Sequence, residues 1–112
     1  MSGTLPLTIG NFQSMSSLIL VGSKIGGTIP STIGALTSLT VLQIPFNDLN
    51  GAVPSSMGAL TSLTTLYLNS NSFTGTIPSG ISVLKSLSHL VISRNYFNGI
   101  IPSSIGAMTN LE

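Results

Sequence analysis

The chain has 112 residues and little charge, since lysine, arginine, aspartate and glutamate make up only 4% of it. A soluble domain averages about 25% charged residues. The formal net charge is +1 and no basic cluster occurs, which excludes nucleic-acid binding through phosphate neutralisation and electrostatic attachment to anionic lipid. There is no cysteine, so the sequence offers no disulfide and no thiolate metal site.

A short glycine–proline motif recurs along the whole chain. Its glycines stand at positions 3, 27, 51, 75 and 99, and a proline follows three residues later each time, as in Gly51-Ala52-Val53-Pro54. The spacing between consecutive glycines is constant along the chain, without a slip. A fixed period of about 20 to 50 residues indicates a solenoid, in which successive turns of the chain stack.

Apolar residues keep the same period. With Leu36 as position one of a repeat, position seven is leucine in every full repeat, and positions one, four, nine and fourteen are apolar in nearly all of them. The leucines of position seven are Leu18, Leu42, Leu66 and Leu90. Side chains at the same repeat position are expected to lie on top of one another and form the core.

The pattern Leu39-x-x-Leu42-x-Ile44-x-x-Asn47-x-Leu49-x-Gly51-x-Val53-Pro54 resembles a leucine-rich repeat. Its Gly-x-Ile/Val-Pro ending and its 24-residue length are similar to the plant-specific class of that family. This class includes receptor-like kinase and receptor-like protein ectodomains and polygalacturonase-inhibitor-like proteins. The resemblance implies an α/β solenoid, a right-handed coil with a parallel β-sheet on its concave face and short 3-10 or irregular segments on its convex side.

The repeats predict a single leucine-rich repeat array. It begins with a half-turn at 1–11, continues through full repeats 12–35, 36–59, 60–83 and 84–107, and ends with a partial repeat at 108–112. Both ends fall in mid-turn, and the paired-cysteine caps usual in the family are missing. We therefore expect a fragment of a longer array, the alternative being a short natural product whose ends pack on a partner or on a copy of itself.

Each full repeat should contain a short strand around positions seven and nine, where apolar and polar residues alternate. Examples are Leu66-Tyr67-Leu68 and Leu90-Val91-Ile92. Strands of successive turns should stack in parallel about 4.8 Å apart. At position twelve, Asn47, Asn71 and Asn95 are expected to form a ladder of amides that bond buried backbone groups. Ser23 takes this position in the first full repeat and should leave that turn looser.

The titratable residues form no catalytic constellation. Asp48 and Glu112 are more than two turns apart, which argues against paired-carboxylate catalysis. His89 is the sole histidine and has no acid near it, which argues against a nucleophilic triad and a metal site. Lys24 and Asp48, both at position thirteen, should form an exposed ion pair. We predict no enzymatic activity, no cofactor and no metal.

The resemblance implies a ligand-binding face on the concave strands. Phe46 and Tyr67 are the expected anchors, because aromatic residues dominate contact energy at interfaces, and Arg94 and His89 would add polar contacts. Alternatively, these positions vary because nothing constrains them. The full predicted set is Ser17, Ile19, Val41, Gln43, Phe46, Thr65, Tyr67, Asn69, His89, Val91 and Arg94.

Three functions stay open. The first is a protein- or peptide-recognition module of a cell-surface or secreted protein, with membrane attachment only through segments outside this chain. The second is a structural spacer or coat, which low charge and near-identical turns would suit. The third is binding to ice or a carbohydrate surface through hydroxyl rows, one of which, at Thr37 and Thr61, is interrupted by Lys85. The longer row is Ser31, Ser55, Ser79 and Ser103. Self-association through the uncapped ends also stays open.

Overall fold

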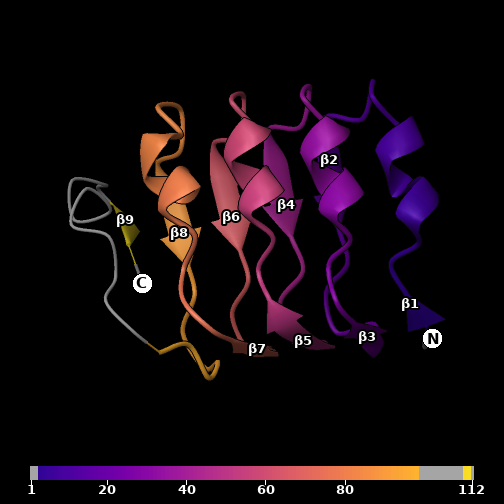
Figure 1. The fold of residues 1–112 in the computed structure, drawn as a ribbon, viewed down its shortest axis with the longest axis vertical. Coiled ribbons are helices and arrows are strands. Elements are labelled where there is room, and N and C mark those ends of the chain that lie inside the picture. The colour runs from indigo at the N-terminus through magenta and orange to yellow at the C-terminus, as the bar shows by residue number, and fades with distance from the viewer. Residues whose placement is uncertain (1–2, 99–109, 112) are drawn as a thin grey trace.

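The computed structural model describes residues 3–98 and 110–111 as a coil of stacked turns (Figure 1). The three turns between Ser17 and Val83 each repeat the same order of a strand, a second strand and a short helix. The extents of the coil are 35 × 29 × 19 Å. The predicted solenoid is therefore confirmed, and every turn is positioned by contacts with the turns before and after it.

One parallel sheet, called the concave sheet here, has the strand order β2-β4-β6-β8-β9. Leu42 pairs with Leu66 and Leu66 with Leu90, so these turns stack at the period of the sequence repeat. The last strand departs from this period, because Leu90 pairs with Leu111, which follows it by less than one full repeat. The strands are β2 (Ser17–Ile19), β4 (Val41–Gln43), β6 (Thr65–Tyr67), β8 (His89–Val91) and β9 (Asn110–Leu111).

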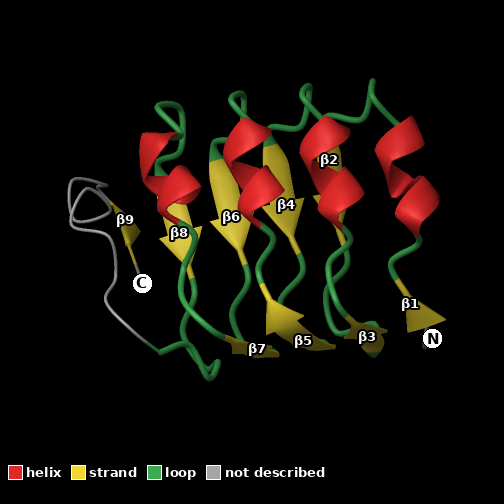
Figure 2. Cartoon of the chain, viewed as in Figure 1, coloured by secondary structure: helices red, strands yellow, loops and turns green. Residues whose placement is uncertain are grey.

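A second parallel sheet, which the sequence analysis did not predict, has the order β1-β3-β5-β7. Figure 2 shows its strands along the lower edge of the coil, while β2, β4, β6 and β8 of the concave sheet lie behind the helices. Its register falls short of a full period, since Asn50 pairs with Ser72 and not with Thr74, the residue at the same repeat position. The strands are β1 (Gly3–Thr4), β3 (Ile25–Gly27), β5 (Asp48–Ala52) and β7 (Ser72–Thr74).

Short 3-10 helices form the convex side, as predicted. Each follows a proline, for example Pro30 with φ −68° and ψ 146°, whose ring fixes φ and which has no N–H to satisfy. Neighbouring helices approach closely: a Cβ added to Gly34 would lie 2.7 Å from the carbonyl oxygen of Ser56. The helices are η1 (Leu7–Asn11), η2 (Ser31–Ala35), η3 (Ser55–Ala59) and η4 (Ser79–Val83).

The core is a column of side chains through the middle of the coil. Leu42, Leu66 and Leu90 are 1%, 0% and 0% exposed, as the period predicted. Leu18, in the same column, is only half-buried, because β2 is the edge strand of its sheet. Phe12, directly after the first 3-10 helix, is 56% exposed. The middle turns therefore contribute most of the hydrophobic stabilisation.

The three asparagines of position twelve lie between the two sheets. Each side-chain oxygen accepts a hydrogen bond from a backbone N–H 22 residues earlier, at 3.0–3.1 Å. Each side-chain nitrogen donates to a carbonyl 27 residues earlier, at 2.6–2.9 Å. Asn47, Asn71 and Asn95 therefore link consecutive turns. In the first full repeat, the Ser23 hydroxyl makes only a local bond, to the carbonyl of Val21 at 3.4 Å.

The expected ion pair between Lys24 and Asp48 was wrong. The register of the second sheet is shorter than the repeat, so the residue opposite Asp48 is Gly26. Lys24 has a left-handed backbone conformation with φ 56°. Neither side chain makes an ion pair with any described residue. Equal repeat positions are therefore neighbours in the concave sheet but not in the second sheet.

Candidate binding face

The concave strands bring the two predicted rows of site residues together. Strand pairing aligns Ser17, Val41, Thr65 and His89 in one row and Ile19, Gln43, Tyr67 and Val91 in the other. Side chains of a strand alternate between faces, so both rows point away from the buried leucine column. Ser17, Ile19 and His89 are exposed, and the other five are half-buried. Asn69, next to the second row, is also half-buried.

A third row lies just after the strands and has an unusual backbone. Gly22, Phe46, Ser70 and Arg94 all have φ between 58° and 60°, in the left-handed region. The ladder continues through them, since the N–H of Phe46 donates to the carbonyl of Asn69 at 3.2 Å. Only glycine adopts this conformation without strain. Phe46 keeps a bulky side chain there although that side chain is 59% exposed.

Exposed apolar side chains gather at one end of this face. Ile19 is 54% exposed, Val21 52% and Phe46 59%, and we call these three residues the apolar patch. Val21 was not among the predicted site residues. It is an apolar residue directly before Gly22 of the third row, and that position could have indicated it. Exposed apolar groups in one cluster are typical of contact surfaces.

The other end of the face is polar. His89 and Arg94 are exposed, and the ring nitrogen Nδ1 of His89 lies 2.9 Å from the hydroxyl of Ser88. Ser70 lies between Phe46 and Arg94 in the third row, and its buried hydroxyl has no partner among the described residues. Ser70 was not among the predicted site residues, because an unbonded hydroxyl has no sequence signature.

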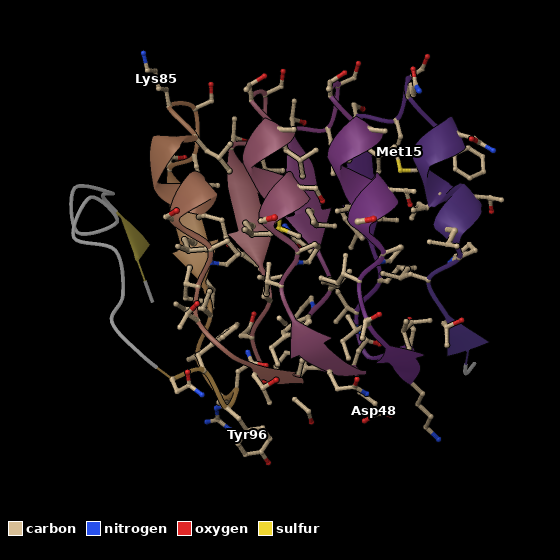
Figure 3. All side chains as sticks on the ribbon, viewed as in Figure 1. Met15, Asp48, Lys85 and Tyr96 are labelled. Carbon is tan, nitrogen blue, oxygen red and sulfur yellow. The ribbon has the colours of Figure 1, made fainter. Side chains whose placement is uncertain are left out.

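The described residues hold no group of three or more His, Cys, Asp or Glu side chains that could bind a metal ion. None of the helices in this part of the chain has the length and apolar character to cross a membrane. Figure 3 shows Asp48 on the edge of the coil that carries the second sheet and Lys85 on the opposite edge. These two charged side chains therefore lie apart from one another.

Comparisons with known proteins agree with this geometry. The family model described as Leucine Rich Repeat matches residues 62–84 and 86–108. The sequence has no match among curated proteins. Among solved structures, the fold is similar to the ectodomain of the plant membrane receptor kinase GASSHO1/SCHENGEN3 from Arabidopsis thaliana, solved in complex with CASPARIAN STRIP INTEGRITY FACTOR 2. That match has 33% identity and a TM-score of 0.92, and covers 99% of this chain and 13% of that one.

Two further structures are similar over nearly the whole chain. The plant peptide hormone receptor RGFR1, in complex with RGF2, has 35% identity and a TM-score of 0.93 and is matched over 99% of this chain and 18% of its own. A plant ice-binding protein has 34% identity and a TM-score of 0.88, over 94% of this chain and 34% of its own. The chain thus spans between 13% and 34% of the length of these three proteins.

Both the family model and the structures identify the class of this protein. The chain is built of leucine-rich repeats, and its repeats and fold support the plant-specific class. Its similar structures include extracellular ectodomains of plant receptors, a class of ligand-binding modules.

Proposed function

We propose that this chain is a protein- or peptide-recognition module of a cell-surface or secreted leucine-rich repeat protein. It binds its partner through the concave sheet and the row that follows it. The similar receptors GASSHO1/SCHENGEN3 and RGFR1 were solved in complex with CASPARIAN STRIP INTEGRITY FACTOR 2 and RGF2, which supports a protein or peptide partner outside the cell.

The proposal rests on the backbone conformation and the exposure of Phe46. Its backbone has φ 58° and its ring is 59% exposed. A non-glycine residue in this conformation costs about 1–2 kcal/mol, and burial of the ring offsets little of that cost. Ser70 and Arg94 share this φ, so the conformation belongs to the repeat, and Phe46 differs from them by the large apolar ring that it exposes there. The backbone of Phe46 lies beside that of Gly22, which directly follows the exposed Val21, so an aromatic or aliphatic ligand side chain would be desolvated there.

The test is selection of binding peptides from a displayed random library on the immobilised chain. Dissociation constants of the selected synthetic peptides are then measured by calorimetry. We expect the combined Phe46→Ala and Tyr67→Ala substitution to weaken binding by about a hundredfold, as for anchor residues at an interface centre. Lys85→Ala is the control, because Lys85 is exposed on the edge of the coil opposite the second sheet and is not one of the predicted site residues (Figure 3).

Two outcomes would contradict this proposal. One is a set of peptides whose affinity the double substitution leaves undiminished, which would exclude the concave face as their site. The other is a library that yields no binder, while changes in the number of repeats alter the function of the parent protein. That second result would favour the structural spacer.

A second candidate function is ice binding, which the similarity to a plant ice-binding protein favours. Ser31, Ser55 and Ser79 begin successive 3-10 helices and are exposed, as are Thr37 and Thr61. Ser103, the fourth serine of the predicted row, lies outside the described residues. These hydroxyls recur once in each turn, which would suit a periodic surface.

Thermal hysteresis of the purified chain tests the second candidate. If the hydroxyl rows bind ice, a gap should open between melting and freezing, and Ser55→Lys together with Thr61→Lys should abolish it. The absence of hysteresis in the unsubstituted chain would rule ice binding out.

A further inference from the structure

The second sheet presents a face that neither the concave rows nor the predicted hydroxyl rows include. Asp48 and Ala52 are exposed on the outward side of β5, and the other outward side chains are small or planar and uncharged. We call these uncharged polar side chains the second-sheet face: Thr28, Asn50, Ser72, Thr74, Tyr96 and Asn98. All are exposed except Ser72, which is half-buried, and Tyr96 is 69% exposed.

Backbone bonds hold this face in a fixed arrangement. Asn50 pairs with Ser72, and Thr74 pairs with Ala52. The ladder continues beyond β7, since the N–H of Tyr96 donates to the carbonyl of Phe73 and that of Asn98 to the carbonyl of Gly75, both at 2.8 Å. Phe97 turns inward and stacks on Phe73 with ring centroids 6.0 Å apart. Tyr96 and Asn98, on either side of Phe97, therefore point outward.

Several hydroxyls of the described residues bond the backbone of a neighbouring turn. Those of Thr40 and Thr64 each donate to a carbonyl of the preceding turn, at 2.9 Å and 3.0 Å, and that of Thr32 donates to the carbonyl of Leu7 at 2.7 Å. These hydroxyls hold the coil together. The side chains of the second-sheet face make no hydrogen bond with any described residue. Their donors and acceptors are all available to a partner.

The chemistry of the face limits what that partner is. The second sheet also carries the exposed carboxylate of Asp48, on the same side of β5 as Asn50, and no basic cluster, so it offers no attraction to nucleic acid or to an acidic polymer. It lacks the cluster of large apolar anchors that a protein interface uses. Amides and hydroxyls both donate and accept, as the hydroxyls of a sugar do. The exposed Tyr96 ring can pack against the C–H face of a sugar ring.

We propose that the second-sheet face binds a neutral polysaccharide. Its strands lie about 4.8 Å apart, so successive sugars of an extended chain meet equivalent hydroxyl or amide groups on successive turns. The Tyr96 ring stacks on one sugar, while Asn50, Thr74 and Asn98 bond the hydroxyls of others. This site is independent of the concave face.

Affinity electrophoresis of the purified chain tests the proposal, with soluble mixed-linkage β-glucan or hydroxyethyl cellulose in the gel. Both neutral polymers should retard the chain, and polygalacturonate should not. Tyr96→Ala combined with Thr74→Asp should weaken retardation at least about tenfold, as expected for loss of an aromatic anchor. Asn98→Asp is a second, milder substitution that tests the same face without removing the ring.

Two controls separate this site from the others. Thr61→Asp is also a threonine-to-aspartate change, at the repeat position of Lys85. Lys85 lies on the edge of the coil opposite the second sheet, so this variant should leave retardation unchanged (Figure 3). Phe46→Ala with Tyr67→Ala should also leave it unchanged, whether or not the concave face binds peptides. Thermal unfolding of each variant checks that the coil is intact.

Three results would overturn the proposal. The first is an absence of retardation by either neutral polymer. The second is a loss of retardation by Thr61→Asp or by the concave-face substitutions equal to that by Tyr96→Ala with Thr74→Asp. The third is thermal hysteresis that the second-sheet substitutions abolish in a chain that binds no glucan, which would make ice the occupant of this face.

Discussion

The side-chain oxygen of Asn47 accepts a hydrogen bond from the backbone N–H of Ile25 at 3.1 Å, 22 residues earlier in the chain. The same oxygen accepts a bond from the N–H of Ser23 at 2.9 Å, 24 residues earlier. These two separations are also the registers of the two sheets, since Leu42 pairs with Leu66 in the concave sheet and Asn50 with Ser72 in the second. Asn47 lies between the sheets and bonds at both separations, so its amide fixes how one sheet is shifted against the other.

Asn71→Ala should destabilise the coil strongly. It would leave the N–H of Leu49 without its bond of 3.1 Å, while the carbonyls of Ile44 and Leu68 would each keep one amide donor, from Asn47 and Asn95. A buried polar group left unsatisfied costs about 1–3 kcal/mol, so we expect a loss of about that size in urea denaturation. Asn50→Ala, on an exposed position of β5, should change stability by less than about 0.5 kcal/mol. Equal effects of the two changes would contradict the amide ladder.

The leucine column gives a comparison between identical substitutions. Leu66→Ala opens a cavity at a side chain that is 0% exposed, and such changes cost about 2–5 kcal/mol. Leu18→Ala removes the same atoms from a half-buried side chain at the sheet edge and should cost about half as much or less. Chemical denaturation followed by circular dichroism measures both. A larger loss at Leu18 would mean that the first turn carries more of the core than its burial indicates.

Gly34→Ala tests the close approach of the 3-10 helices. The added methyl would lie 2.7 Å from the carbonyl oxygen of Ser56 and 2.9 Å from its Cβ, so backbone atoms would have to move. Overpacking of this kind costs about 1–3 kcal/mol. Gly26→Ala is the control, because its nearest atom, the carbonyl oxygen of Asp48, is 3.9 Å away. We expect a lower melting temperature only for the first variant, and unchanged melting of both would refute the steric argument.

Ser70→Ala should stabilise the protein. The Ser70 hydroxyl is buried and has no partner among the described residues, and a buried unbonded hydroxyl costs about 1–3 kcal/mol. Ser88→Ala makes the same change where the hydroxyl donates to the carbonyl of Thr64 at 3.3 Å, and it should destabilise by about 0.5–1.5 kcal/mol. Opposite signs are therefore expected from one substitution type in urea titrations. A loss of stability at Ser70 would show that its hydroxyl has a bond.

Phe46→Gly should separate stability from binding. Glycine relieves the left-handed strain at φ 58° that alanine retains, so Phe46→Gly should be more stable than Phe46→Ala by about 1 kcal/mol. Both variants lose the ring and should lose peptide affinity together. Thermal melting and peptide titration of the two variants give the comparison. If the alanine variant is the more stable, the strain at Phe46 has been overestimated; if either variant binds as the parent does, Phe46 is not an anchor.

Much of the fold was predictable because the repeat is local and strict. The column of Leu42, Leu66 and Leu90 followed from the period, and the 3-10 helices of the convex side followed from the resemblance to leucine-rich repeats. The predicted rows of the concave sheet also followed, since Thr65 does pair with Val41 and His89. A residue's burial in these elements depends on its own repeat position and on the identical position of the next turn.

The sequence by itself therefore determined the family, the stacking of turns and the inner face of the concave strands, because side chains one period apart meet there. Only the tertiary structure decided the second sheet, its shorter register and the neutral face it presents. That register depends on amide bonds between turns, such as the bond between Asn47 and Ile25. The length of the sequence repeat alone therefore does not predict it. The left-handed conformation of Phe46 was likewise fixed by bonds to its neighbouring turn.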